Sequence, residues 1–150
     1  MSARTEMNTL QLSIADTDQE MRSCFEVMRE LRPHLQDAEA FVAQVRRQSV
    51  QGYRLLMALQ DGQVIALAGY RLQENLLYGC FLYVDDLVVS RNVRSQGLGA
   101  ALINYMRDEA RRMGCANFVL DTALGNALGQ RFYYRLGLLA IGMHFRQSLT

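Results

Sequence analysis

The sequence predicts an α/β protein (α+β in some schemes) with a mixed central sheet and helices on both of its faces. Three observations support this fold class. Apolar residues alternate in some stretches and recur at three- and four-residue spacing in others, so strands and helices are interspersed along the chain. Asp61-Gly62 between two apolar stretches favours a tight antiparallel hairpin. A strand, a glycine loop, a helix and another strand follow downstream, and such a unit returns parallel by a right-handed crossover.

The N-terminal part predicts one strand and two helices. Leu10–Ile14 alternates between apolar and polar residues, which is typical of a strand. Thr17 and Glu20 have the spacing of a capping box in front of an amphipathic helix. Pro33 stops this helix because the residue before a proline is pushed out of helical geometry. A second helix begins after Asp37, which can cap its N-terminus.

The rest of the chain continues the alternation of strands and helices. The expected elements are strands over 54–59, 64–70 and 80–89, a helix over 97–113, a strand over 118–122, a helix over 126–136 and a final strand over 139–145. The order β-α-α-β-β-β-α-β-α-β results. With 150 residues, half of them hydrophobic, the chain suffices for one domain over 1–150 with a full core.

Composition narrows the partners and the location. The net charge of +1 provides no strong field for nucleic acid or for an anionic membrane surface, so neither is expected as a partner. No apolar stretch resembles a signal peptide or a membrane span, and a cytoplasmic protein is expected. Cys24, Cys80 and Cys115 are scattered without C-x-x-C spacing, so we expect packed, reduced thiols and no metal.

Two carboxylates interrupt the central strand. Asp85 and Asp86 lie in the middle of a β-branched and aromatic stretch. Because side chains alternate along a strand, the two are expected on opposite faces. A charge within an apolar strand is unfavourable unless it is used. These aspartates are therefore candidates for a functional site, with pairing to an arginine or to backbone amides as the alternative for Asp86.

A glycine loop follows this strand and predicts an anion site. Arg94–Gly99 precedes residues at helical spacing, and glycines with a helix N-terminus present amide N–H groups to a phosphate. A P-loop would need Lys-Ser/Thr where Ala100 and Ala101 stand, and a dinucleotide fingerprint would need a small residue in place of Leu102. Neither motif fits.

R-x-x-G-x-G after a strand ending in Leu-Val-Val resembles the acyl-CoA signature of the GNAT acyltransferase superfamily. Downstream, Asn126-x-x-Gly129-x-x-Phe132-Tyr133-x-x-Leu136-Gly137-Leu138 is similar to a second GNAT pattern, N-x-x-A-x-x-F-Y-x-x-L-G-F. Gly129 and Leu138 depart from it. The resemblance implies the acyl-CoA N-acyltransferase fold, acetyl-CoA (coenzyme A) as co-substrate and N-acetyltransferase activity, and a homodimer is expected by fold analogy.

The resemblance also implies residue roles. Tyr133 would donate a proton to the leaving thiolate, and core packing is the alternative for an aromatic residue on a helix. Asn126 would form a hydrogen bond with the pantetheine arm of coenzyme A. A simple N-cap of the last helix is the alternative, and one side chain could do both. The residues expected to bind the cofactor are Leu87, Val88, Val89, Arg94, Ser95, Gln96, Gly97, Leu98, Gly99, Ala100, Asn126 and Tyr133.

The central strand itself resembles the E-D-L/F-x-V strand of diamine N-acetyltransferases, with Asp85 in place of the glutamate. Asp85 and Asp86 are accordingly expected to act as the base or to bind the amine. Together with Tyr133, they are the predicted catalytic residues. His34 and His144 are further substrate-binding candidates, with ordinary surface histidines as the alternative. The predicted reaction is direct acetyl transfer to a primary amine of a small molecule. A protein lysine or N-terminal acetyltransferase and a silent acyl-CoA sensor are the alternatives.

Overall fold

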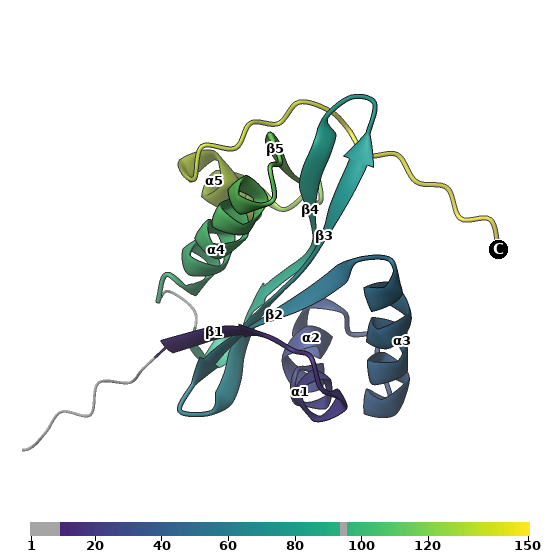
Figure 1. Cartoon of the computed structure of the whole chain (residues 1–150), viewed down its shortest axis with the longest axis vertical. Helices are drawn as coiled ribbons and strands as arrows, with labels where there is room; N and C mark the ends of the chain where they lie inside the picture. Colours follow the sequence, from purple (N-terminus) through teal and green to yellow (C-terminus); the bar gives the residue numbers. More distant parts are fainter. Residues whose placement is uncertain (1–9, 94–95) are drawn as a thin grey trace, which may run out of the picture. The chain divides into compact units, whose positions relative to one another are not determined.

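Figure 1 shows the computed structural model of the chain, which describes residues 10–93 and 96–150. The chain divides into two compact units, Met1–Val119 and Leu120–Thr150, and each is described by itself. The strands are β1 (Leu10–Ile14), β2 (Tyr53–Gln60), β3 (Gln63–Asn75), β4 (Gly79–Val89) and β5 (Asn117–Leu120). The helices are α1 (Asp18–Ser23), α2 (Phe25–Leu31), α3 (Ala38–Val50), the 3₁₀ turn η1 (Arg91–Val93), α4 (Leu98–Arg112) and α5 (Ala127–Arg135).

The five strands form one mixed sheet in the order β1-β2-β3-β4-β5, which confirms the predicted fold class. The pairs β1–β2, β2–β3 and β3–β4 are antiparallel. The hairpin between β2 and β3 forms at the predicted turn. Asp61 and Gly62 have φ of 51° and 77°, as a type I′ turn requires, and Gln60 pairs with Gln63.

The first predicted helix is divided into α1 and α2 at Cys24. The capping box forms: Glu20 N–H donates to Thr17 Oγ1 and Thr17 N–H donates to Glu20 Oε1. The Ser23 hydroxyl and the Cys24 thiol then both donate to the Glu20 carbonyl. These side chains compete with the backbone for that acceptor, which explains the interruption. Pro33 ends α2 as predicted, since Leu31 is its last residue.

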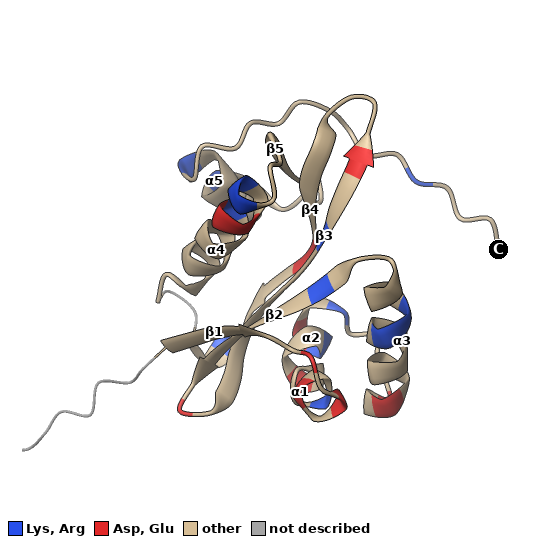
Figure 2. Cartoon of the chain, viewed as in Figure 1, with Lys and Arg blue, Asp and Glu red and all other residues tan. Residues whose placement is uncertain are grey.

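Helices lie on both faces of the sheet in the first unit. The helices α1, α2 and α3 cover one face, and α4 lies on the other (Figure 1). The core under α1–α3 combines Phe25, Phe41 and Val45 with inward residues of the strands such as Leu55 and Leu67. Charged residues lie mainly on the helices, whereas the strands are largely free of them (Figure 2).

The second unit contains α5 and an extended segment. The predicted strand over 139–145 is wrong, because residues 138–150 have no regular secondary structure. Leu139, Ile141, Met143 and Phe145 alternate as in a strand but are all exposed. Alternation alone does not make a strand, since its N–H and C=O groups need a paired neighbour. Of the helices that the structure describes, none has the length and apolar character needed to cross a bilayer.

Candidate active site

A β-bulge brings the two aspartates of β4 to the same side. In the β3–β4 ladder Gly69 pairs with Asp86 but Tyr70 pairs with Val84, so Asp85 is an extra residue without a partner. A bulge rotates the chain locally and can turn consecutive side chains to one face. The expectation that Asp85 and Asp86 point to opposite faces is therefore wrong. Both line one cavity of about 340 Å³.

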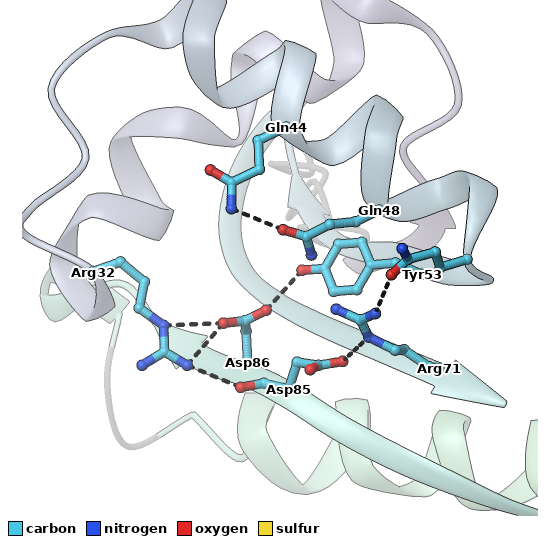
Figure 3. Close-up of polar contacts among 8 residues, drawn as sticks. Arg32, Gln44, Gln48, Tyr53, Arg71, Asp85 and Asp86 are labelled. Atoms are coloured by element: carbon cyan, nitrogen blue, oxygen red, sulfur yellow. Dashed lines mark hydrogen bonds and ion pairs between the residues drawn. The ribbon is translucent and has the colours of Figure 1, made fainter. Parts of the chain in front are cut away.

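Asp86 is held by two donors from different elements (Figure 3). Its Oδ1 accepts hydrogen bonds from Arg32 Nε at 3.0 Å and Nη2 at 2.9 Å, and its Oδ2 accepts from the Tyr53 hydroxyl at 2.7 Å. Burial, and next the negative charge of Asp86, raises the pKa of Tyr53 well above its ordinary value, so this hydroxyl keeps its proton. Both oxygens of Asp86 are thus engaged.

Asp85 is less constrained. Arg71 Nε donates to its Oδ2 at 3.0 Å, and the described residues provide no partner for its Oδ1. Burial raises the pKa of Asp85, and the neighbouring Arg71 opposes this increase only in part. A carboxylate with a raised pKa and a free oxygen is a better base than an ordinary aspartate. The geometry thus gives the two carboxylates different surroundings, and Asp86 is paired with an arginine, which was the alternative considered for it from the sequence.

The other walls of the cavity come from α2, α3 and the strands. On α3, Gln44 Nε2 donates a hydrogen bond to Gln48 Oε1 at 3.0 Å, and both side chains lie over the aspartates (Figure 3). His34 also lines the cavity, so this substrate candidate does lie beside Asp85 and Asp86. Met28, Leu35, Phe41 and Val45 supply an apolar part.

Three residues that contact the aspartates were not predicted: Arg32, Tyr53 and Arg71. Each is separated from the aspartates by many positions in the chain, so no local motif connects them. Arg71 carried a weak signal, because it is a charge within the long strand β3. Its guanidinium also lies over the Tyr53 ring, 5.5 Å from the centroid, which fixes both side chains beside Asp85.

The glycine loop leads into α4 as expected. Gly97 is the N-cap of α4 with φ of 71°, without a capping side chain, and the first turn contains no acidic residue. The first amides of a helix have no intrahelical acceptor, so those of Leu98, Gly99 and Ala100 are suited to an anion. Arg94 and Ser95 lie outside the described residues.

Leu87, Val88 and Val89 pair with β3 through Ala68, Leu67 and Ala66. On the other side β4 has β5 as its neighbour, but β5 has 4 residues against the 11 of β4. A strand of this length can pair with only part of β4.

The second unit holds the remaining predicted residues. Asn126 caps α5, since its Oδ1 accepts from Gly129 N–H at 3.0 Å, and its Nδ2 donates to Thr122 Oγ1. Burial raises the pKa of Tyr133, and the described residues offer no hydrogen-bond partner to its hydroxyl. His144 lies in the segment after α5, and its Nδ1 is 3.5 Å from Oδ2 of Asp121, which precedes α5. This histidine therefore pairs within its own unit.

Metal ligation has no candidate in residues 10–93 and 96–150, where no three His, Cys, Asp or Glu side chains come together. No buried side-chain nitrogen or oxygen in this part of the chain lacks a hydrogen-bond partner.

Sequence comparison agrees with this arrangement of strands and helices. Residues 14–138 match the acetyltransferase (GNAT) family. The uncharacterized N-acetyltransferase YhdJ of Bacillus subtilis is 30% identical over 116 residues, which are 77% of this chain and 81% of that protein. The aminoalkylphosphonate N-acetyltransferase of Salmonella typhimurium is 30% identical over 98 residues, 65% of this chain and 62% of that protein. The chain belongs to the GNAT family of acetyltransferases.

Solved structures support the same fold. An aminoglycoside N-acetyltransferase in complex with CoA superposes with a TM-score of 0.84 at 15% identity, covering 99% of this chain and 100% of that one. An acetyltransferase of Trypanosoma brucei superposes with a TM-score of 0.79 at 23% identity, covering 94% and 100%. At these identities the likeness concerns the fold.

Proposed function

We propose that this acetyltransferase moves the acetyl group of acetyl-CoA to a primary amine of a small molecule, by direct attack within a ternary complex. The observation that supports it most is the cavity of about 340 Å³ that Asp85 and Asp86 line. This volume suits a small ligand. Residues of α3 and of the segment between α2 and α3 line one side of this cavity, which favours a small acceptor over a protein segment that would need a long groove.

In this proposal Asp85 takes the proton from the amine that receives the acetyl group, directly or through a water. An alkylammonium has a pKa of about 10 and cannot attack while charged. The raised pKa of Asp85 and its unoccupied Oδ1 suit this role. Asp86 accepts hydrogen bonds from Arg32 and Tyr53 and so keeps these two side chains in place at the cavity. Its negative charge orients the amine. His34 lies at the wall as a further acceptor contact.

Acetyl-CoA would be held by backbone amides. Gln96 and Gly97 and the first turn of α4 would receive the pyrophosphate, with Arg94 and Ser95 contributing as the GNAT signature implies. Leu87, Val88, Val89 and Asn126 remain the proposed pantetheine contacts. The lack of a capping side chain and of acidic residues at the start of α4 supports this assignment.

Tyr133 is the proposed donor to the departing thiolate. Its phenol is protonated at neutral pH, and burial raises its pKa further above the ordinary value. Tyr133→Phe is expected to lower turnover about tenfold or more and to leave the Kd for acetyl-CoA unchanged. Steady-state kinetics and calorimetry measure the two quantities. The neighbouring Tyr134, which is 54% exposed, provides the control: Tyr134→Phe should keep full turnover. Equal turnover of both variants would remove Tyr133 from the mechanism.

Gly97→Ala is expected to weaken acetyl-CoA binding roughly fivefold to tenfold, because an alanine resists the left-handed conformation that Gly97 adopts at φ of 71°. Titration calorimetry measures the Kd. Gly62 is a matched control, since it has φ of 77° in the β2–β3 hairpin, and a Cβ added there would have no heavy atom within 4 Å. Gly62→Ala should lose similar stability and bind acetyl-CoA normally. The pyrophosphate assignment is wrong if both variants bind equally well.

One experiment tests the proposed function itself. Acetyl-CoA binding is measured by calorimetry, and release of the CoA thiol is then followed with a panel of acceptors: diamines, an aminoalkylphosphonate, an amino sugar phosphate, an aminoglycoside and peptides with a free lysine or N-terminus. The sequence has no lysine, so lysine side chains of the protein add no background acetylation. Arg32 and Arg71 at the cavity are the reason to include amines that also carry an acidic group. Thiol release only with peptides would favour a protein acetyltransferase, and binding without any release would favour a sensor.

A further inference from the structure

Two cysteines that are distant in the sequence meet in the first unit. Cys80 is the second residue of β4, and Cys115 lies between α4 and β5. Their Sγ atoms are 2.7 Å apart, although the two residues are separated by 35 positions in the chain. This separation exceeds the length of an S–S bond by only about 0.7 Å. The sequence predicted packed, reduced thiols, and all three cysteines are free in the structure. The contact between Cys80 and Cys115 was not predicted.

Both cysteines lie on hydrogen-bonded backbone. Cys80 pairs with Glu74 in the β3–β4 ladder. Cys115 N–H donates to the Ala110 carbonyl at 2.8 Å, and Gly114 N–H donates to the Arg111 carbonyl at 3.1 Å. Gly114 has φ of 76°, so these two bonds form the Schellman motif that ends α4. The sulfur–sulfur contact therefore follows from a strand register and a helix cap and does not depend on a flexible loop.

We propose that Cys80 and Cys115 form a reversible disulfide that joins the start of β4 to the turn between α4 and β5. The oxidant is a low-molecular-weight disulfide such as oxidised glutathione. One cysteine thiolate attacks it and releases the first small thiol, and the second cysteine attacks the resulting mixed disulfide and releases the other. One S–S bond forms in the protein, one is reduced, and the two protons of the cysteine thiols end on the two released thiols.

The cross-link would stabilise the chain without closing the site. It encloses residues 80–115, so it restricts the unfolded chain over the span that includes both aspartates and the loop before α4. Cys80 lies six residues before Asp86, about 20 Å along an extended strand, and no residue of the cavity is a cysteine. We expect the oxidised protein to keep its turnover and to melt at a higher temperature.

Burial, and the hydrogen bond with Cys80, raises the pKa of Cys115 to about 11, so thiolate is scarce at neutral pH and the exchange is slow. The protein should therefore be incubated for many hours in oxidised or in reduced glutathione. Cys24 is buried, with a pKa raised by burial to about 12, and serves as an internal reference thiol that does not react in the folded protein.

The test counts thiols after removal of glutathione and denaturation. The reduced sample should give all three thiols, and the oxidised sample should give one, with a Cys80–Cys115 peptide found by mass spectrometry after proteolysis. The melting temperature of the oxidised sample should rise by about 5–10 °C. Three remaining thiols, a mixed disulfide with glutathione as the end product, or a disulfide between two chains would each overturn the proposal.

Variants separate the pair from a general effect of oxidation. Cys80→Ser and Cys115→Ser should each abolish the increase in melting temperature, whereas Cys24→Ala keeps the pair and should retain the increase. If a serine variant does not fold, the thiol count and the cross-linked peptide of the unmodified chain still decide the question. An increase that persists in both serine variants would contradict the assignment.

Discussion

Gly69→Ala is expected to lower the free energy of unfolding by about 3 kcal/mol and to reduce kcat/KM at least tenfold. A Cβ at this position would overlap the Tyr53 hydroxyl and would lie 2.6 Å from Asp86 Oδ2. Gly69 pairs with Asp86 beside the bulge, so the backbone has little freedom to move away. The added methyl group must therefore displace Tyr53 or Asp86 and break the hydrogen bond between them. Urea unfolding and steady-state kinetics measure the two effects.

The matched control is Gly142→Ala. A Cβ at Gly142 would have no heavy atom within 4 Å, and its φ is outside the left-handed region. This variant should change the free energy of unfolding by no more than about 0.5 kcal/mol. If Gly69→Ala were as stable and as active as the control, the contact between Tyr53 and Asp86 would not exist in solution as the structure has it.

Asp85→Asn is expected to reduce kcat/KM about a hundredfold, because an amide cannot accept the proton of the acceptor amine. Its effect on stability should be small. Burial raises the pKa of Asp85 above the ordinary 3.8, so the ionised form is disfavoured in the folded state. The contribution of this group to stability is therefore largest below pH 3.8 and is lost as the pH rises through the folded pKa. A neutral asparagine avoids that loss, and its Oδ1 can still accept from Arg71.

The pH profile of kcat/KM provides the second measurement. In the unmodified enzyme the acidic limb should lie above pH 3.8, where Asp85 loses its proton, and this limb should be absent from Asp85→Asn. Asp108, which is exposed on α4, provides the control, since Asp108→Asn should leave both the rate and the profile unchanged. Normal activity of Asp85→Asn would show that another group accepts the proton.

The orientation of Asp85 and Asp86 could not be predicted from the sequence. The pattern identified both residues as charges within an apolar strand, and its strict alternation placed them on opposite faces. The bulge at Gly69 and Tyr70 inserts Asp85 as an unpaired residue and brings both carboxylates into one cavity. A single extra residue in a ladder depends on the partner strand, which the sequence of β4 does not contain.

The sequence by itself determined the features that rest on neighbouring residues: the capping box at Thr17, the Asp-Gly hairpin, the stop at Pro33, and the two GNAT signatures that identify the family. Their physics is local, since a cap, a turn or a helix face involves residues within a few positions of each other. Only the tertiary structure decided that Arg32 and Tyr53 hold Asp86, that Cys80 meets Cys115, and that residues 139–145 form no strand. Each of these depends on strand register or on contacts between distant segments, which the packing of the whole chain sets.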